Sequence, residues 1–146
     1  MPDAVLALER LMSGGGDPIE LVLTLDPSTL QALGIADRPW LVVNGPLLPE
    51  QLGPLQASAG VIFFPCELES FGFPLAEARV NRQPVVAPDT ALSREVAGDA
   101  LVPYHPGDVN SLAAAFDEAL GLTLPPLREN PFDPGRYFTC LFEFQS

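Results

Sequence analysis

The sequence predicts an α/β fold, a Rossmann-like parallel sheet with helices on both faces. Segments with helical spacing of apolar residues alternate with short apolar runs, which is the order expected around a parallel sheet. Two of these runs, residues 61–64 (VIFF) and 84–87 (PVVA), are apolar throughout, as is typical of strands buried on both faces. The chain has 146 residues, the usual length of one domain, so we expect a single domain over residues 1–146.

The first half of the chain is expected to contain three helices and three strands. Residues 4–12 carry apolar side chains at helical spacing, and a run of glycines after Ser13 ends this helix. Residues 19–25 form an apolar strand, after which Asp26 and Pro27 offer the cap and first position of a short helix that stops near Gly34. The remaining elements are a strand over residues 40–43, a helix over 49–59 and the strand over 61–64.

The second half continues the alternation of helices and strands. We expect a helix over residues 73–81, a strand over 84–87, a short helix over 93–97 and a short strand over 100–102. Asp108 or Asn110 caps a further helix that runs to Leu120. Residues 122–131 form a Pro-rich connector, and residues 132–144 form a last helix, which Asp133 caps.

Composition excludes several classes of function. Acidic residues number 19 against 7 basic residues, all arginine, and the resulting net charge of −12 argues against binding to nucleic acid or to anionic lipid. No apolar stretch approaches the roughly 20 residues of a membrane helix. The N-terminal segment is too short and too acidic for a signal peptide, so we expect a cytoplasmic protein.

The sequence offers little for metal or nucleophilic chemistry. Cys66 and Cys140 are interpreted as buried free thiols, and His105, the single histidine, as a surface or turn residue. No zinc-ligand spacing is present, and the aspartates form no Asp-x-Asp pair. We therefore expect no metal and no resident cofactor.

The longest polar stretch at the end of a predicted strand is residues 65–77, and in an open parallel sheet ligands bind beyond such ends. Gly72 permits close approach of the backbone, and Pro74 fits the first turn of a helix, whose free N–H groups near residues 72–76 attract an anion. Glu69 and Glu77 bracket this turn. The alternative, on these grounds alone, is a capped loop with solvated acids, in which Glu77 complements the helix dipole without any ligand.

Residues 61–103 resemble the C-terminal, donor-binding domain of the retaining family-4 glycosyltransferases, which have the GT-B fold. The similarity is carried by the strand VIFFP, the segment ESFGFP over 69–74, the Glu69/Glu77 pair with seven residues between them, the strand PVVA and the segment EVAGDA over 95–100. Weaker similarity covers residues 40–47, 108–120 and 132–144, where the last helix of the family crosses back toward the acceptor domain.

The resemblance implies a role for each matching residue. Glu69 would act at the donor sugar as the catalytic residue, and Glu77 would bind the ribose hydroxyls of a nucleotide-diphosphate sugar. Backbone groups at the helix start would bind sugar and phosphate oxygens, and a turn after the second strand would form one wall for the base. The implied donor-binding residues are Phe71, Gly72, Phe73, Pro74, Leu75 and Glu77 at the helix start, and Gly45, Pro46 and Leu47 at the turn.

The sequence also departs from the family. It lacks the family's first strand, with the Gly-Arg turn and the lysine that clamp the diphosphate, so Arg79 and Arg94 are the candidate phosphate cations. Asn81 or Arg82 stands where the family has a glycine and must take a left-handed turn. In the family's sheet the missing strand is central, and an empty slot would leave backbone groups unpaired. Three solutions are open: the strands over 19–25 and 61–64 pair directly, a second copy or another chain inserts a strand, or the fold is marginally stable and prone to aggregation. We favour self-association or a partner, such as a separate chain that carries the N-terminal acceptor domain, because helix packing resists closing a gap of roughly 5 Å per strand.

Two hypotheses of different class follow. The first is the donor-binding part of a hexosyltransferase-like enzyme of carbohydrate biosynthesis that transfers sugar with retention and is inactive without an acceptor domain. The second is a degenerate, non-catalytic α/β module that binds a partner or regulates it. Nucleotide binding separates the two hypotheses.

Overall fold

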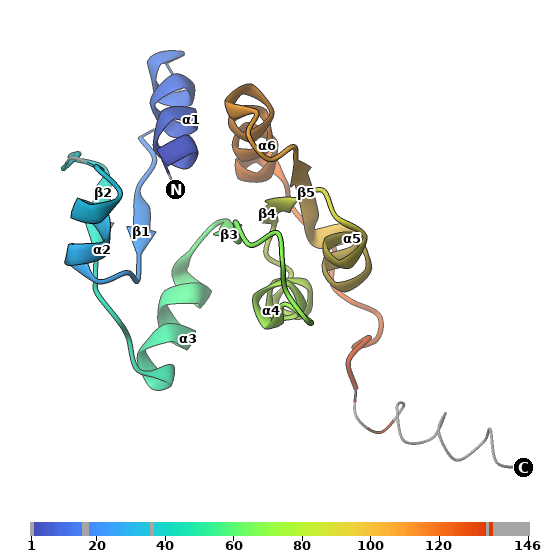
Figure 1. The fold of residues 1–146 in the computed structure, drawn as a ribbon. Coiled ribbons are helices and arrows are strands. Elements are labelled where there is room, and N and C mark those ends of the chain that lie inside the picture. The colour runs from blue at the N-terminus through green and yellow to red at the C-terminus, as the bar shows by residue number, and fades with distance from the viewer. Residues whose placement is uncertain (1, 16–17, 36, 134, 136–146) are drawn as a thin grey trace, which may run out of the picture.

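The computed structural model describes residues 2–15, 18–35, 37–133 and 135. Its helices are α1 (Pro2–Ser13), α2 (Pro27–Ala32), α3 (Pro49–Ser58), α4 (Phe73–Asn81), α5 (Ala91–Ala97) and α6 (Val109–Gly121), with a short 3-10 turn at Gly98–Ala100. Its strands are β1 (Leu21–Leu23), β2 (Leu41–Val43), β3 (Ile62–Phe63), β4 (Val85–Pro88) and β5 (Leu101–Tyr104). Figure 1 shows these elements in chain order.

The strands form two separate parallel sheets. In the first sheet β1 pairs with β2, with Val22 opposite Val42. In the second, β4 lies between β3 and β5, with Val86 opposite both Phe63 and Val102. Figure 1 shows the β1–β2 pair beside α2, apart from the second sheet. The α/β class with parallel strands is confirmed, but the described strands divide between two sheets.

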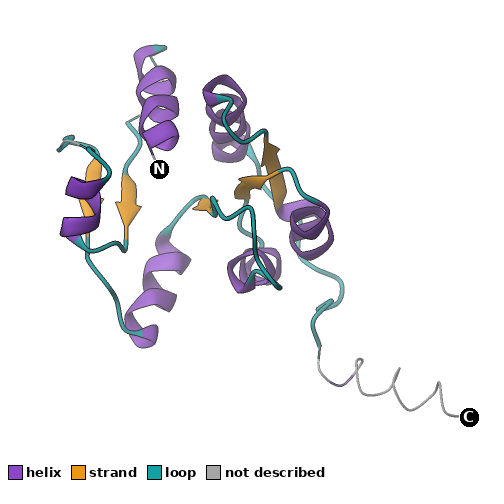
Figure 2. Cartoon of the chain, in the orientation of Figure 1, coloured by secondary structure: helices purple, strands orange, loops and turns teal. Residues whose placement is uncertain are grey.

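Strand β4 is buried on both faces and organises the core. Val86 belongs to one apolar cluster with residues of α1, β5 and α6, including Leu8, Val102 and Leu112. Its neighbours Val85 and Ala87 belong to a second cluster with residues of α4 and α5. Because successive side chains of a strand point to opposite faces, β4 separates the two layers of helices that Figure 2 shows around it.

Most sequence-based expectations agree with the structure to within one or two residues. Asp26 and Asp108 cap α2 and α6 as expected: Asp26 accepts from the Ser28 N–H, and Asp108 accepts from the N–H groups of Asn110 and Ser111. No helix or strand forms in the connector over residues 122–131. The helix expected over residues 132–144 lies, apart from its first residues, outside the described part of the chain. No helix in the described segments is long and apolar enough to cross a membrane.

The break between the two sheets leaves one edge of β1 and one edge of β3 without a paired strand. In β3 the N–H groups of Ile62 and Phe64 donate to carbonyls of the β4 segment, so the N–H of Phe63 points to the open edge. The direct pairing of β1 with β3 that would argue against a partner does not occur among the described strands. The partner, or self-association, stays a prediction.

The turn after α4 takes the left-handed conformation that the sequence requires. Arg82 is the residue that adopts it, with φ of 58° and ψ of 39°, and it is the single non-glycine residue with positive φ in the described segments. This conformation costs a non-glycine residue roughly 1–2 kcal/mol. The Arg82 guanidinium donates two hydrogen bonds to the Asp99 carboxylate, at 3.0 and 2.7 Å, which offset that cost.

Substitution of Arg82 separates the strain from the ion pair. Arg82→Ala keeps the left-handed backbone and loses the ion pair with the exposed Asp99, so we expect it to lower the free energy of unfolding by about 0.5–1 kcal/mol. Arg82→Gly also loses the pair but relieves the strain, and should be about 1 kcal/mol more stable than Arg82→Ala. Urea unfolding measures both, with Arg128→Ala as the exposed control. Equal losses in the two variants would contradict the strain.

The Arg82–Asp99 pair also predicts a pH dependence. Hydrogen bonds from Arg82 lower the pKa of Asp99 below its usual value, which is about 3.9 in an unfolded chain. A lowered carboxyl pKa stabilises the fold above the unfolded pKa, and this contribution disappears as the pH falls through the folded pKa. The stability difference between wild type and Asp99→Asn should therefore be constant from pH 5 to 7 and shrink below about pH 4. A difference that grows on acidification would exclude this explanation.

Candidate functional site

The predicted donor site lies at the start of α4, at the end of the loop that follows β3. Gly72 is the residue before the helix and has φ of 76° and ψ of 65°, in the left-handed region. A Cβ at this position would lie 2.9 Å from Leu75 Cδ1 and 3.6 Å from Glu69 Cγ. Gly72 therefore has a left-handed backbone that glycine favours, and the same geometry places the Glu69 side chain close to the start of the helix.

Fewer backbone amides are free at this helix start than the sequence suggested. The N–H groups of Leu75 and Ala76 both donate to the Gly72 carbonyl, at 2.9 and 3.3 Å, so the expectation that these two are free is wrong. Pro74 has no N–H. The Phe73 N–H, by contrast, has no acceptor among the described residues, and the partial positive charge of a helix N-terminus adds to its pull on an anion.

The two glutamates lie on either side of this turn and are exposed. Glu69 Oε1 accepts hydrogen bonds from the N–H and the hydroxyl of Ser70, at 2.8 and 3.2 Å, so its carboxylate is held by its own loop. Glu77 lies one turn into α4, where it accepts a 3.4 Å hydrogen bond from Gln56 of α3. Both carboxylates keep acceptor capacity for hydroxyl groups of a ligand.

Aromatic side chains border the helix start. Phe71 contacts the rings of Phe73 and Phe132 edge to face, with centroids 5.2 and 5.9 Å apart. Phe73 is 72% exposed, which makes it an open apolar surface beside the turn. Since Phe132 lies beyond the connector, the C-terminal end of the described chain folds back onto this site.

Both candidate phosphate cations have internal partners. The Arg79 guanidinium donates to the carbonyls of Glu95 and Val96 at the end of α5, at 3.2 and 3.3 Å, while its Nε is buried with no acceptor in the described part of the chain. Gly98 makes room for this guanidinium, because a Cβ there would lie 2.7 Å from Arg79 Cζ. Arg94 forms a two-bond ion pair with Asp89, at 2.6 and 2.7 Å, and this pair lowers the pKa of Asp89.

The turn after β2, predicted to border the base, has the conformation that its glycine permits. Gly45 has φ of 69°, and a Cβ there would meet nothing within 4 Å. Pro46 is exposed, and Leu47 is partly buried. The contacts of the described residues do not join this turn to Glu69 or Gly72, so its part in a common site stays a prediction.

Sequence reasoning missed a hollow at the carboxyl ends of β3 and β5, which has a volume of about 110 Å³. None of the predicted donor residues lines it. The carboxyl ends of β3 and β5 indicate this edge of the sheet, because ligands bind beyond such ends in open parallel sheets. Nothing in the sequence indicates that α1 lies beside this edge. Its lining is formed by Asp3, Ala4, Phe63, Pro65, Glu67, Tyr104, Pro106, Gly107, Asp108 and Leu112.

Metal ligation finds no support in the described geometry. Within residues 2–15, 18–35, 37–133 and 135, no three or more His, Cys, Asp and Glu side chains are grouped so that they could hold a metal ion.

The left-handed backbone at Gly72 yields a stability prediction. Gly72→Val places a β-branched residue at positive φ, which should lower the free energy of unfolding by about 1–3 kcal/mol and disturb the loop without any ligand. Gly53→Ala is the matched control, since Gly53 lies inside α3 with no atom within 4 Å of the added Cβ. Thermal unfolding of both variants measures the difference, and similar melting temperatures would argue against a role for the positive φ.

Comparison with known proteins gives one informative similarity. No family model matches the chain. Over 81 residues, 56% of this chain, it is 33% identical to O-antigen chain mannosyltransferase B of Escherichia coli. The aligned part spans about a fifth (21%) of that protein's length. The similarity supports a relationship of this chain to glycosyltransferases.

Proposed function

We propose that this chain is the donor-binding part of a retaining glycosyltransferase of the GT-B type and that it binds a nucleotide-diphosphate sugar at the start of α4. The similarity to a mannosyltransferase supports transfer of a sugar, and makes a mannosyl donor the first to test. The acceptor belongs, in this proposal, to a further domain that contributes the other side of the cleft. Donor binding is therefore the property that this chain has by itself.

The observation that carries the proposal is the arrangement around Gly72. At the left-handed glycine the Glu69 stem lies close to the helix start, where the Phe73 N–H has no acceptor among the described residues. A phosphate or sugar oxygen fits this position because the helix N-terminus is partly positive. The Glu69 carboxylate beside it can accept hydroxyl protons of the sugar and stabilise positive charge that develops at the anomeric carbon.

Glu77 has a separate task in this scheme. Its exposed carboxylate, one turn into α4, accepts two hydroxyl protons of the ribose, and Gln56 holds it from the other side at 3.4 Å. Gly45, Pro46 and Leu47 then border the base. The division gives Glu69 the reacting sugar and Glu77 the nucleotide, so their substitution should affect different steps.

The non-catalytic module remains a second candidate because of one observation. Arg79 and Arg94, the candidate cations near the phosphates, are bonded to carbonyls and to Asp89, and the chain carries a net charge of −12. Recruiting either arginine to a diphosphate costs its present hydrogen bonds. Nucleotide affinity is therefore weaker in this proposal than in an enzyme with an uncommitted cation pair.

Titration with nucleotides tests the proposal directly. Calorimetry or amide NMR with UDP, GDP and ADP should show saturable binding of at least one of them, with shifts concentrated at residues 69–77. Saturable binding whose shifts lie elsewhere would contradict the assigned site. Complete lack of binding to all three would favour the non-catalytic module.

Substitution of the two glutamates tests their separate roles. Glu77→Ala should weaken nucleotide binding by about 1–3 kcal/mol, because it removes charge-assisted hydrogen bonds to the ribose. Glu69→Ala should reduce sugar transfer or donor hydrolysis, measured with the acceptor domain present, more than it reduces nucleotide affinity. Glu118→Ala, an exposed acid on α6, is the control. Negligible effects of both substitutions on affinity and turnover would remove the case for a working site.

A further inference from the structure

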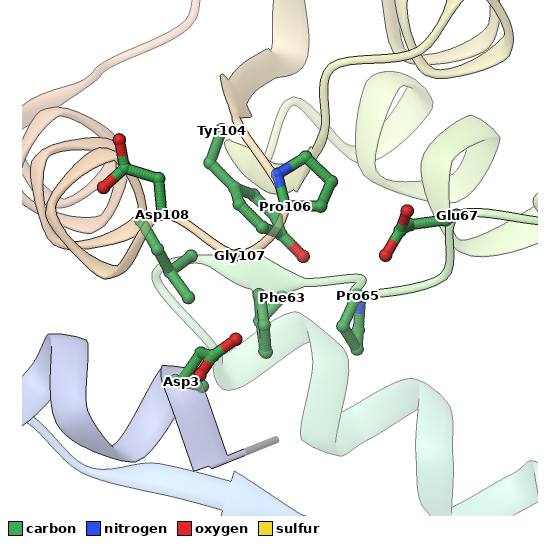
Figure 3. Close-up of a pocket in the computed structure, with 10 residues that line it drawn as sticks. Asp3, Phe63, Pro65, Glu67, Tyr104, Pro106, Gly107 and Asp108 are labelled. Atoms are coloured by element: carbon green, nitrogen blue, oxygen red, sulfur yellow. The ribbon is translucent and has the colours of Figure 1, made fainter.

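The hollow at the ends of β3 and β5 is built from parts that lie far apart in the sequence. Phe63, Pro65 and Glu67 come from β3 and the loop after it, Tyr104 from the end of β5, and Asp3 from the first turn of α1. Figure 3 shows these side chains around a common space, with Phe63 between Asp3 and Tyr104. At about 110 Å³, this space is several times the roughly 30 Å³ that one water occupies.

Tyr104 directs its hydroxyl group into this space (Figure 3). The residue is 8% exposed, and its hydroxyl points into the hollow in Figure 3. Within the described residues the hydroxyl has no hydrogen-bond partner. Burial, followed by the negative charges of Glu67 and Asp3, raises the pKa of Tyr104. The side chain is largely buried, but its hydroxyl oxygen is still accessible to solvent at the hollow, so it can donate to or accept from a ligand there.

The charge of the hollow favours a cation. Figure 3 shows the Glu67 and Asp3 carboxylates at its rim, whereas the Asp108 carboxylate points away, where it caps α6. No arginine or histidine is among the residues that line it. The N-termini of α1 and α6 bring partial positive charge, but Asp3 and Asp108 offset it at their respective helices. Among the described residues that line the hollow, none carries a positive charge that would compensate Glu67.

We propose that this hollow binds one guanidinium group. A guanidinium is planar, is weakly hydrated and stacks on aromatic rings, and here the rings of Phe63 and Tyr104 lie with centroids 6.2 Å apart at 44°. Its N–H groups donate to the carboxylates of Asp3 and Glu67 and to the Tyr104 hydroxyl. A divalent metal ion fits less well, because the described acids form no group that could ligate it.

This proposal goes beyond donor binding, since the predicted donor residues lie outside the hollow. Two sources supply the same chemistry: a small guanidinium compound, or an arginine side chain of a second polypeptide. The shared group is what the hollow recognises, and the experiment below distinguishes the two sources.

Amide NMR titration of the full chain with methylguanidinium chloride tests the proposal. We expect saturable shifts centred on residues 63–67 and 104–108, with dissociation constants that increase as salt is added. Methylurea, which has nearly the same shape without the charge, is the matched probe and should bind at least tenfold more weakly. Equal binding of both compounds, or shifts from methylguanidinium only outside these segments, would overturn the proposal.

Three variants locate the group. Glu67→Gln and Asp3→Asn should each weaken methylguanidinium binding at least fivefold, and Tyr104→Phe about two- to fivefold, while Glu118→Gln should leave it unchanged. The wild-type comparison with methylurea needs no variant, so it remains decisive if Tyr104→Phe perturbs the core. Undiminished binding by both Glu67→Gln and Asp3→Asn would rule out this hollow as the site.

A peptide identifies the source. The blocked tripeptide acetyl-Gly-Arg-Gly-amide carries the guanidinium on a polypeptide backbone. Binding at least tenfold tighter than that of methylguanidinium supports the proposal with an arginine of a partner chain as the ligand. Similar affinities support it with a small compound as the ligand, and absence of binding by both probes overturns it.

Discussion

The arrangement of this molecule depends on the burial of β4 on both faces. Val86 joins the layer of α1 and α6, and Val85 and Ala87 join the layer of α4 and α5. Because β4 also pairs with β3 and β5, its register sets where the loops after those two strands emerge. Both the helix start at Gly72 and the hollow beside Tyr104 lie on such loops. The chemistry of the chain is therefore positioned by a strand that has no polar side chain of its own.

The parts of the fold that could be predicted are those that local chemistry determines. The apolar run at β4 indicated burial on both faces, Asp26 and Asp108 indicated helix starts, and the Asn81–Arg82 step required a left-handed turn without glycine. The division into two sheets is of another kind. It depends on whether β1 pairs with β3 in one sheet, and neither strand carries a side chain that determines this pairing.

The candidate site was predictable to the same extent. Glu69, Gly72 and Glu77 fall within nine residues of one loop and helix, so their spacing already placed them around one turn. The state of the backbone amides was not predictable, because the closure of Leu75 and Ala76 onto the Gly72 carbonyl depends on the tightness of the first turn. The hydrogen bonds of Arg79 depend on where α5 ends, and the ion pair of Arg94 with Asp89 depends on where α5 begins. The hollow requires α1 to meet the ends of β3 and β5.

The loop after β3 serves two surfaces that differ in charge preference. Glu67 faces the hollow with Tyr104 and Asp3, while Glu69, two residues later, lies near Gly72 at the start of α4, where the Phe73 N–H has no acceptor among the described residues. The first surface is negative and suits a cation, whereas the second combines a partly positive helix end with a carboxylate and suits a phosphosugar. The net charge of −12 favours the first and opposes the second at long range. If both proposals hold, a cation at Glu67 reduces the negative charge next to the proposed donor site, so that occupancy of the hollow and affinity for a nucleotide should rise together through electrostatics, without any change in the fold.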